Sequence, residues 1–353
     1  MEKMFIYGFN LQFLFEKIKP KLSEHYDLKY YNGFTKIKQR NFILSPLIVL
    51  ISLFSAFFKI VTFKPNYIML VSSKPSMIGP LMFFFKKKIK IIYFPYDAMC
   101  LNYKNYKLNP FYDRIWEGYC YKVCSGIIFK GGEFTEVKNF FDIEHKPHLK
   151  INLLTLKNTH ALVEKTSPYL KVCYIGYTLI MDDNPDYVSD IKILKKFVNQ
   201  KIFVQVYSPE KNRKYFSDII TSKYFKFTSF VKNEVLIKEI RTFDYGLHIT
   251  YLHKNAKLTE EMYNTTMANR EYDYLQAGLP IIVGDSGNIS NFVTENKIGF
   301  AFSLEQLDHL DKDLLLKNRN AFKENIELAR RKYAFENQIP EFLEFMKKVK
   351  EVK

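Results

Sequence analysis

The stretch NREYDYLQAGLPIIVGDSGNISNF, residues 269–292, gives the clearest indication of local structure in the chain. Its first part suits a helix, which Gly278 ends as a C-cap and Pro280 prevents from continuing. The apolar run at 281–283 predicts a buried strand, and the turn residues 284–287 lead into another helix. A helix, a buried strand and a second helix in direct succession are typical of a parallel α/β sheet.

Two features of this stretch indicate a ligand. Free backbone N–H groups at the helix start formed by Ser286, Gly287 and Asn288 favour a phosphate group. The carboxylate of Asp273, one helical turn after Arg270, is placed to bind ribose hydroxyls. Together they predict a bound nucleoside diphosphate. A helix–turn–strand unit without any ligand is the alternative, because spacing alone does not separate the two.

The rest of the chain repeats the same alternation of strands and helices. Strands are expected at 4–9, 26–31, 66–73, 89–94, 125–129, 171–177, 201–208, 226–230, 245–252 and 279–283. Helices are expected at 11–24, 46–62, 76–85, 111–124, 186–198, 212–222, 232–242, 267–277, from 288, and at about 319–352. This pattern predicts doubly wound parallel sheets, which bind ligands beyond the carboxyl ends of their strands.

A less regular patch at about 142–168 separates two similar halves. We therefore expect a first Rossmann-like domain at 1–165 and a second at 166–335, facing each other across a cleft. The closing segment 336–353 is expected to be helical and to cross back to the first domain.

The net charge limits the possible binding partners but does not identify one. The 353 residues carry 53 Lys and Arg against 37 Asp and Glu, a net charge of +16 that favours phosphate-rich partners. Nucleic acid, anionic lipid and phosphorylated small molecules all fit.

The four cysteines, Cys100, Cys120, Cys124 and Cys173, form no CxxC pair and predict reduced thiols in a cytoplasmic protein. The N-terminal residues predict a core strand, because they lack a signal-peptide cleavage site.

The segment REYDYLQAGLPIIVGDSGNISNFV, residues 270–293, resembles the donor-binding segment of GT-B glycosyltransferases, especially family 4. The matching positions are Arg270, Asp273, Tyr274, Leu275, Ala277, Gly278, Leu279, Pro280 and Ile281. Weaker similarity is found in KPNYIMLVSS (64–73), YFPYDAM (93–99) and KVCYIG (171–176). The resemblance implies two Rossmann-like domains and transfer of a sugar from a nucleotide sugar, without a metal or another cofactor and with retained anomeric configuration.

The resemblance also implies roles for particular residues. Asp273 would hold the donor ribose. The other expected donor-binding residues are Arg270, Tyr274, Gly278, Ser286, Gly287, Asn288 and Gly176. Two family features are missing: Thr266 stands where many members have a second Glu, and GYTLIMDDNPD (176–186) lacks the usual Arg and Lys. Arg270 and Lys130 are possible substitutes for these cations.

The first half contributes further candidates beside its strand ends. Asp97 follows the strand at 89–94, where a catalytic role is expected and a turn cap is the alternative. Gly8, Lys130, Gly131 and Gly132 are expected to line the cleft, and Arg270 is the second catalytic candidate. The run FKGGEFTEV (129–137) resembles a diguanylate cyclase signature, but it follows a strand and opens a helix, so we expect a β-to-α turn. His145 and His148 are expected in a solvated loop, and His248 in the core.

The stretch NFILSPLIVLISLFSAFFKIV, residues 41–61, raises the question of membrane contact. A helix from 46 to 61 would be about 24 Å long at 1.5 Å per residue, short for a bilayer core of about 30 Å. It fits either a core helix or one lying in the headgroup region, with Ser52, Ser55 and Lys59 as a thin polar stripe. With MFFFKKKIK (82–90), it predicts docking on the anionic inner face of the cytoplasmic membrane.

The favoured function is therefore a peripheral glycosyltransferase acting on a lipid-linked or cell-surface glycan precursor. A GT-B sugar-nucleotide epimerase is one alternative, since it would share the fold and the donor site. A basic nucleic-acid-binding or membrane-binding pseudoenzyme is another. Because no reader motif accompanies the positive charge, no nucleic-acid partner is expected.

Overall fold

The computed structural model describes residues 1–9, 12–33, 44–72, 74–101, 107, 110–156, 159, 161–176, 179–181, 183–184, 187–253, 260–265 and 267–352. The chain forms two compact units. The first contains Met1–Leu153 and Phe335–Lys353, and the second contains Leu154–Ala334. The second unit therefore begins before the expected boundary at 165, and the closing segment lies in the first unit.

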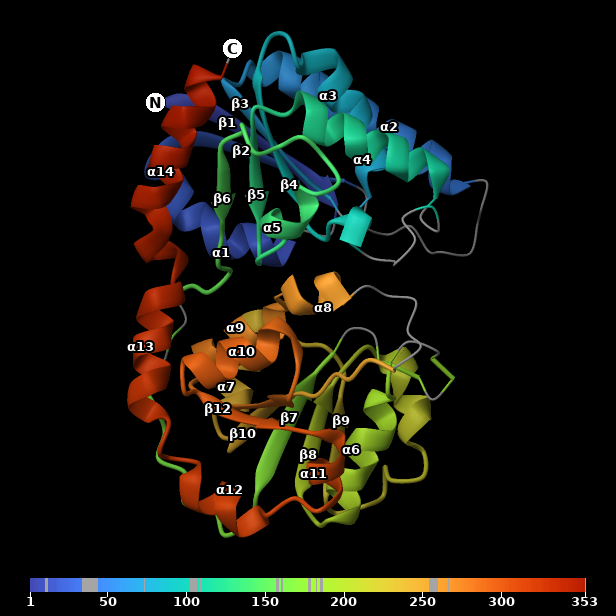
Figure 1. Ribbon diagram of the computed structural model, residues 1–353, viewed down its shortest axis with the longest axis vertical. Helices are drawn as coiled ribbons and strands as arrows, with labels where there is room; N and C mark the ends of the chain where they lie inside the picture. The colour runs from blue at the N-terminus through green and yellow to red at the C-terminus, as the bar shows by residue number, and fades with distance from the viewer. Residues whose placement is uncertain are drawn as a thin grey trace. The chain divides into compact units, whose positions relative to one another are not determined.

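The first unit is built on a six-stranded parallel sheet in the order β2-β1-β3-β4-β5-β6 (Figure 1). Its strands are β1 (Glu2–Phe9), β2 (Tyr26–Gly33), β3 (Tyr67–Ser72), β4 (Lys90–Pro95), β5 (Gly126–Phe129) and β6 (His148–Lys150). Its helices are α1 (Gln12–Leu22), α2 (Leu44–Phe63), α3 (Gly79–Phe85), α4 (Phe111–Val123), α5 (Phe134–Val137) and α14 (Phe335–Glu351). Every residue of β3 is buried, as expected for a strand covered on both faces.

Helix α14 packs on the first sheet although it follows the whole second unit in sequence. It contacts α1, β4 and β6. A Cβ on Gly126 of β5 would lie 2.5 Å from Val349 and 2.9 Å from Phe345, so this position needs glycine for the helix to approach. Phe342, Phe345 and Val349 of α14 are buried.

Helix α2 has one buried and one exposed apolar face. Leu53, Ala56 and Ile60 pack inward, and α2 contacts β1 and β2. Ser52 is fully buried and its hydroxyl lies 3.1 Å from that of Tyr7, so it does not belong to a polar surface stripe as predicted. Within the described residues, no helix is long and apolar enough to cross a membrane.

The second unit is built on another six-stranded parallel sheet, in the order β12-β11-β10-β7-β8-β9. Its strands are β7 (Lys171–Ile175), β8 (Phe203–Tyr207), β9 (Phe225–Thr228), β10 (Tyr245–His248), β11 (Ile281–Gly284) and β12 (Gly299–Phe302). Its helices are α6 (Asp190–Asn199), α7 (Asn233–Ile240), α8 (Glu260–Thr265), α9 (Asn269–Ala277), α10 (Gly287–Glu295), α11 (Leu304–Asp308), α12 (Lys312–Asn318) and α13 (Lys323–Tyr333). The strand order reverses between β7 and β10, where such sheets bind ligands.

The predicted α/β class with doubly wound parallel sheets is confirmed, and the differences are local. The edge strands β6 and β12 were not predicted, and His148 begins β6 instead of lying in a loop. The expected helix at 212–222 is a 3-10 helix at Glu210–Phe216. The expected helix at 319–352 is divided into α13 and α14, because Ala334 has an extended backbone conformation (φ −66°, ψ 130°).

The four cysteines are free, as their spacing predicted, and all four are buried. Burial raises the pKa of all four thiols, that of Cys124 to about 12. They are therefore inert thiols inside the two units.

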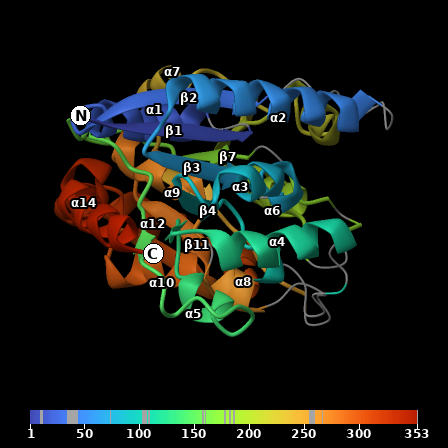
Figure 2. The same cartoon turned by 90° about the horizontal axis from the view of Figure 1, so that it is seen from above.

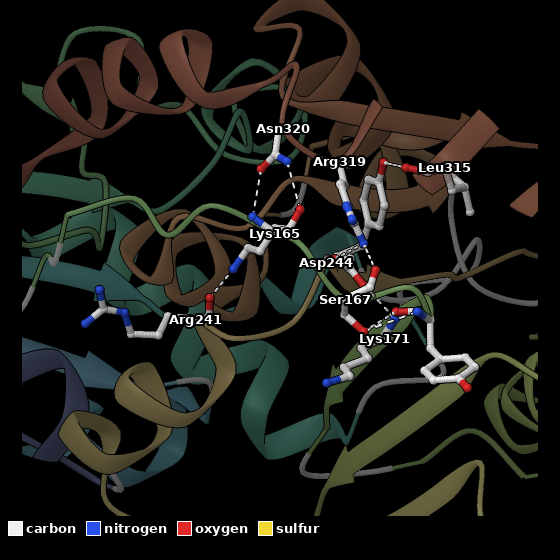
Figure 3. Close-up of polar contacts among 10 residues, drawn as sticks. Lys165, Ser167, Lys171, Arg241, Asp244, Leu315, Arg319 and Asn320 are labelled. Atoms are coloured by element: carbon white, nitrogen blue, oxygen red, sulfur yellow. Dashed lines mark hydrogen bonds and ion pairs between the residues drawn. The ribbon is translucent and has the colours of Figure 1, made fainter. Parts of the chain in front are cut away.

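A polar cluster ties the start of the second unit to its last helices at the amino edge of the sheet (Figure 3). The backbone of Lys165 exchanges two 3.1 Å hydrogen bonds with the side-chain amide of Asn320. Asp244 accepts from the backbone N–H of Lys171 at 2.7 Å and lies 3.5 Å from the guanidinium of Arg319. The Lys165 ammonium donates to the carbonyl oxygen of Arg241.

The stability of the fold is expected to rise between pH 7.5 and 9.5 because of Lys165. This side chain is 7% exposed, and burial lowers its pKa from 10.5 to about 8. Between these values the unfolded chain binds more protons than the folded chain, so raising the pH favours folding. Lys165→Met should reduce this rise by about 1–2 kcal/mol.

Urea denaturation at a series of pH values measures the effect. Lys171→Met is the matched control, because Lys171 contributes its backbone to the same cluster. An equal pH dependence in wild type and in Lys165→Met would contradict the assignment. The window stays below pH 10 because buried tyrosines, whose pKa values are raised, titrate with the opposite effect above it.

Candidate functional site

The carboxyl edge of the second sheet brings the donor-site candidates together. Gly176 follows β7, His248 ends β10, and Ser286 and Gly287 follow β11. Because β7, β10 and β11 are neighbouring parallel strands, these residues lie at one edge of the sheet. This edge includes the point where the strand order reverses.

Helix α9 ends as predicted. Gly278 has φ 78° and ψ 32°, the left-handed conformation of a C-cap. A Cβ there would lie 2.4 Å from Leu162 and 2.9 Å from the guanidinium of Arg330. Arg330 is 2% exposed and donates to the carbonyls of Leu275 and Gln276 at 2.6 and 2.8 Å. Gly278 therefore has a structural reason to be glycine.

Asp273 lies on α9 and is 8% exposed. Its Oδ1 accepts a 3.1 Å hydrogen bond from the amide of Asn233, the first residue of α7. Most of the Asp273 side chain is therefore shielded from solvent. Asn233 belongs to the same site and was not singled out from the sequence.

Arg270 and Asp190 form a second polar group beside β7. The Arg270 guanidinium lies 5.0 Å above the ring of Tyr174. The Tyr174 hydroxyl donates to Asp190 at 2.5 Å, and the backbone N–H of Ile180 donates to the same carboxylate at 3.2 Å. Burial raises the pKa of Asp190, although the charge of Arg270 acts in the opposite direction. Arg270 is therefore engaged by groups of the protein itself.

Tyr274 lies below the site, in the core of the sheet. It is 0% exposed, and its hydroxyl donates to the carbonyl of Leu247 at 2.9 Å. The same hydroxyl accepts from the N–H of Ile175 at 3.1 Å. Its ring fills the space where a side chain on Gly246 would stand. The structure thus gives Tyr274 a packing role between β7, β10 and α9.

A pocket lies where α10 begins. It is lined by His248, Thr250, Tyr263, Val283, Gly284, Ser286, Gly287 and Ile289. Gly287 has φ 84°, and a Cβ there would lie 2.7 Å from the Tyr263 ring. The Tyr263 hydroxyl donates to the carbonyl of Thr250 at 2.6 Å and lies 3.3 Å from that of Ser286. Asn288 lies beside this pocket, with its amide 3.4 Å from the carbonyl of Thr265.

Gly176 is held between β7 and β8. Its carbonyl accepts from the Ser208 hydroxyl at 2.7 Å, and its N–H donates to Tyr207 at 3.0 Å. Residues 177 and 178 and Thr266 lie outside the described residues. Among the residues that the structure does describe, there is no group of three His, Cys, Asp or Glu able to hold a metal.

The candidates of the first unit gather at the carboxyl edge of its own sheet. Asp97 follows β4 and pairs with Lys130, which follows β5, at 2.8 Å. Lys130 is 5% exposed and also lies 4.2 Å from the Tyr96 ring. Burial acts to lower the pKa of Lys130, but Asp97 and Tyr96 outweigh it and raise the pKa. Asp97 is thus the ion-pair partner of Lys130.

The loop that contains Gly131 and Gly132 follows Lys130. The N–H of Gly131 donates to Glu133 at 2.7 Å, and burial raises the pKa of that carboxyl, with Lys130 opposing. Gly8 is buried near the carboxyl end of β1, paired with Val71 of β3. The expected β-to-α turn is found, since α5 begins at Phe134.

Comparison with known proteins gives a matching domain family and several solved structures of the same fold. Residues 187–334 match the family described as glucosyltransferase 3-like, C-terminal domain. A sucrose-phosphate synthase from Thermosynechococcus elongatus superposes with a TM-score of 0.67 at 9% identity, covering 98% of this chain and 99% of that chain. WaaG, a glycosyltransferase involved in lipopolysaccharide biosynthesis, gives 0.66 at 12% identity, covering 96% and 98%. The chain has the GT-B fold of these enzymes, and its residues 187–334 belong to a glycosyltransferase domain family.

A third solved structure shares the same fold. A Listeria monocytogenes protein assigned as a UDP-N-acetylglucosamine 2-epimerase gives a TM-score of 0.57 at 10% identity, covering 96% of this chain and 94% of that chain. No curated protein sequence matches the chain. The resemblance to family 4 is in accord with the family match, which covers Asp273 and the whole of the stretch 269–292.

The sequence did not predict the roles of two acidic side chains near the pocket. Glu271 contacts His248 and is 0% exposed, and Asp190 meets Tyr174. Glu271 stands inside the quoted stretch, but its helical position predicts only that it lies about 200° around the helix from Asn269. Its partner lies 23 residues away on β10, a pairing that only the fold reveals.

Proposed function

We propose that this glycosyltransferase takes its sugar from a nucleoside diphosphate sugar bound at the carboxyl edge of the second sheet. The observation that carries the proposal is the pocket between His248, Ser286 and Gly287, at the start of α10. Backbone N–H groups at a helix start stabilise phosphate charge. Fixed dipoles of this kind would also stabilise the charge that the leaving diphosphate gains during transfer.

Asp273 would hold the ribose of the donor, by resemblance to family 4. Transfer is proposed to need no bound metal or other cofactor and to retain the anomeric configuration, also by that resemblance. The Asp97–Lys130 pair, at the matching edge of the first sheet, is proposed to serve the acceptor side.

A binding screen followed by a transfer assay tests the proposal. UDP, GDP, CDP, dTDP and their sugar conjugates are compared by thermal unfolding. The matching nucleotide, present at 100 times its Kd, should stabilise the protein by about 2.7 kcal/mol. Acceptor-dependent release of nucleotide then distinguishes a transferase from an epimerase, which interconverts sugar nucleotides without release. Stabilisation by none of the nucleotides would contradict the proposal.

The acceptor is proposed to be a lipid-linked or cell-surface glycan precursor, met at the inner face of the cytoplasmic membrane. The support comes from the surface of the first unit, where α2, α3 and α4 lie side by side (Figures 1 and 2). Large exposed apolar side chains gather there: Leu50, Ile51, Phe54, Phe58, Val61, Phe83, Phe84, Phe111, Tyr112 and Ile115. We call these residues the apolar face.

Helical spacing explains how α2 contributes to the apolar face. Ile51, Phe54, Phe58 and Val61 recur every three or four residues and so lie along one side of the helix. The ring of Phe57 lies 5.5 Å from that of Phe84, which connects α2 with α3. An exposed apolar surface of this kind marks an interaction site.

Cations accompany the apolar face and favour an anionic membrane as its partner. Lys86, Lys87 and Lys88 are exposed directly after Phe83 and Phe84. The Lys86 ammonium lies 5.3 Å from the Phe83 ring. Apolar side chains beside lysines suit the boundary between lipid headgroups and acyl chains, where each cation contributes about 1 kcal/mol.

Binding to anionic vesicles is therefore expected, and Phe54→Ser, Phe58→Ser and Phe84→Ser together should weaken it at least about tenfold. These side chains are 63%, 64% and 60% exposed, so the replacements leave the core intact. Sedimentation with anionic and neutral vesicles at low and high salt measures binding. Converting Lys86, Lys87 and Lys88 to Glu should remove the preference for anionic vesicles.

Leu328→Ser is the matched control, because Leu328 is 59% exposed on α13 of the second unit. Its binding should equal that of wild type. If wild type stays in the supernatant with anionic vesicles at low salt, the membrane proposal is wrong and a soluble acceptor follows.

A further inference from the structure

His248 occupies the ligand-binding edge of the second sheet although its strand position predicts a core residue. It ends β10, one residue after Leu247, which pairs with Tyr174 of β7, and it pairs with Val283 of β11. The side chain is 7% exposed and lines the pocket at the start of α10. It therefore stands at the reversal of strand order and beside Ser286 and Gly287.

Glu271 holds one side of the His248 ring. The Nδ1 atom of His248 contacts Oε1 of Glu271, whose side chain is 0% exposed. Oε2 of Glu271 has no hydrogen-bond partner among the described residues. A buried carboxylate is costly unless it is paired with a positive charge or several donors. The ring of His248 is therefore the partner that this buried carboxylate has, and the contact fixes the orientation of the ring.

With Nδ1 taken by Glu271, Nε2 is the ring nitrogen that can serve the pocket. A doubly protonated imidazole donates from both nitrogens. Of the eight described residues that line the pocket, His248 alone can carry a positive charge. Arg270, the nearest arginine in sequence to Glu271, is turned to the Tyr174 ring instead.

Several other charged or titratable groups surround His248. Asp190 lies close enough for the charge of His248 to lower its pKa, although burial raises that pKa more. The groups facing this region are Tyr174 on β7, Asp190 on α6, Glu271 and Arg270 on α9, Tyr263 on α8, and Asp285 between β11 and α10.

We infer that His248, oriented by Glu271, is the cation that binds the diphosphate of the donor at the start of α10. The inference rests on the proposed nucleotide-sugar site and deepens it. His248 would donate from Nε2 to a phosphate oxygen, and the N–H groups that follow Ser286 would bind the same diphosphate. His248 would therefore increase the affinity for the diphosphate, and other residues would bind the nucleoside.

Calorimetry with the nucleoside diphosphate that binds best, and with its nucleoside, tests the inference. His248→Gln keeps a donor of similar reach but removes the charge. It should lower diphosphate affinity by about 10- to 100-fold and change nucleoside affinity less than twofold. Glu271→Gln should lower diphosphate affinity in the same direction, because Glu271 no longer orients His248 or stabilises its charge.

The outcomes separate the two proposals. If wild type binds a nucleoside diphosphate and His248→Gln binds it equally well, the proposed function stands and the inference is overturned. Equal losses for diphosphate and nucleoside would also overturn it, because they indicate damaged packing. If wild type binds no nucleoside diphosphate, both fail together.

Discussion

Replacing Asp273 by alanine is expected to weaken nucleoside diphosphate binding by about 1.5–3 kcal/mol, the scale of a lost hydrogen bond to a charged group. The carboxylate stands on α9 and is 8% exposed. If it binds the ribose, nucleoside and nucleoside diphosphate should lose affinity by the same factor. This pattern differs from that of His248→Gln, which should affect only the diphosphate. Calorimetry with both ligands measures it.

Asn233→Ala is the matched control for Asp273. It removes the same 3.1 Å hydrogen bond from the other partner and leaves the carboxylate in place. We expect nucleoside affinity to fall much less than in Asp273→Ala. Because Asp273 is buried and bonded, its replacement should also cost about 1 kcal/mol of stability, more than a solvent-exposed acid would. Unchanged ligand affinity in Asp273→Ala would remove the residue from the site.

Replacing Arg330 by methionine is expected to destabilise the second unit by about 3–5 kcal/mol. Arg330 is 2% exposed and joins α13 to the end of α9 by donating to Leu275 and Gln276. Methionine keeps much of the apolar stem but leaves two buried carbonyls without charged donors, each bond contributing about 1.5–3 kcal/mol. For a unit of this size the melting temperature should fall by roughly 6–15 °C.

Thermal unfolding followed by circular dichroism measures the change. Arg331→Met is the control, because Arg331 is the exposed neighbour on the same helix and should shift the transition by less than about 2 °C. Glu327→Gln tests the ion pair of Arg330 separately, and its effect should be small because Glu327 is 42% exposed. A transition in Arg330→Met within 2 °C of wild type would show that water replaces the guanidinium at α9.

The sequence predicts the centre of each unit better than its margins. The run from α9 through Gly278 to β11 was legible because a glycine cap, a proline and an apolar strand follow one another. β6 and β12 were missed because edge strands of three and four residues bury little. Local patterns carry no signal for strands whose formation depends on a neighbour.

The candidate site divides in the same way. The positions of Asp97 and Lys130 follow from strand ends that meet at one edge, but their ion pair depends on how their side chains turn. The contact between His248 and Glu271 joins β10 to α9 and has no local signature. Tyr274 matched the family pattern and nevertheless packs inside the sheet, because a tyrosine can serve either role at a helix end.

The path of the chain through the first unit has a consequence for biosynthesis. Gly126 and the strands around it accept Phe345 and Val349 from α14, and the ribosome makes this helix only after the entire second unit. During translation the first sheet therefore lacks α14, and the side of the sheet that α14 covers stays exposed until this helix is made. The second unit, Leu154–Ala334, is synthesised as one continuous segment. The second unit can therefore fold before the first unit is complete, which reverses the usual order of domain folding during synthesis. Until α14 has been made, apolar side chains of the first unit remain accessible to chaperones.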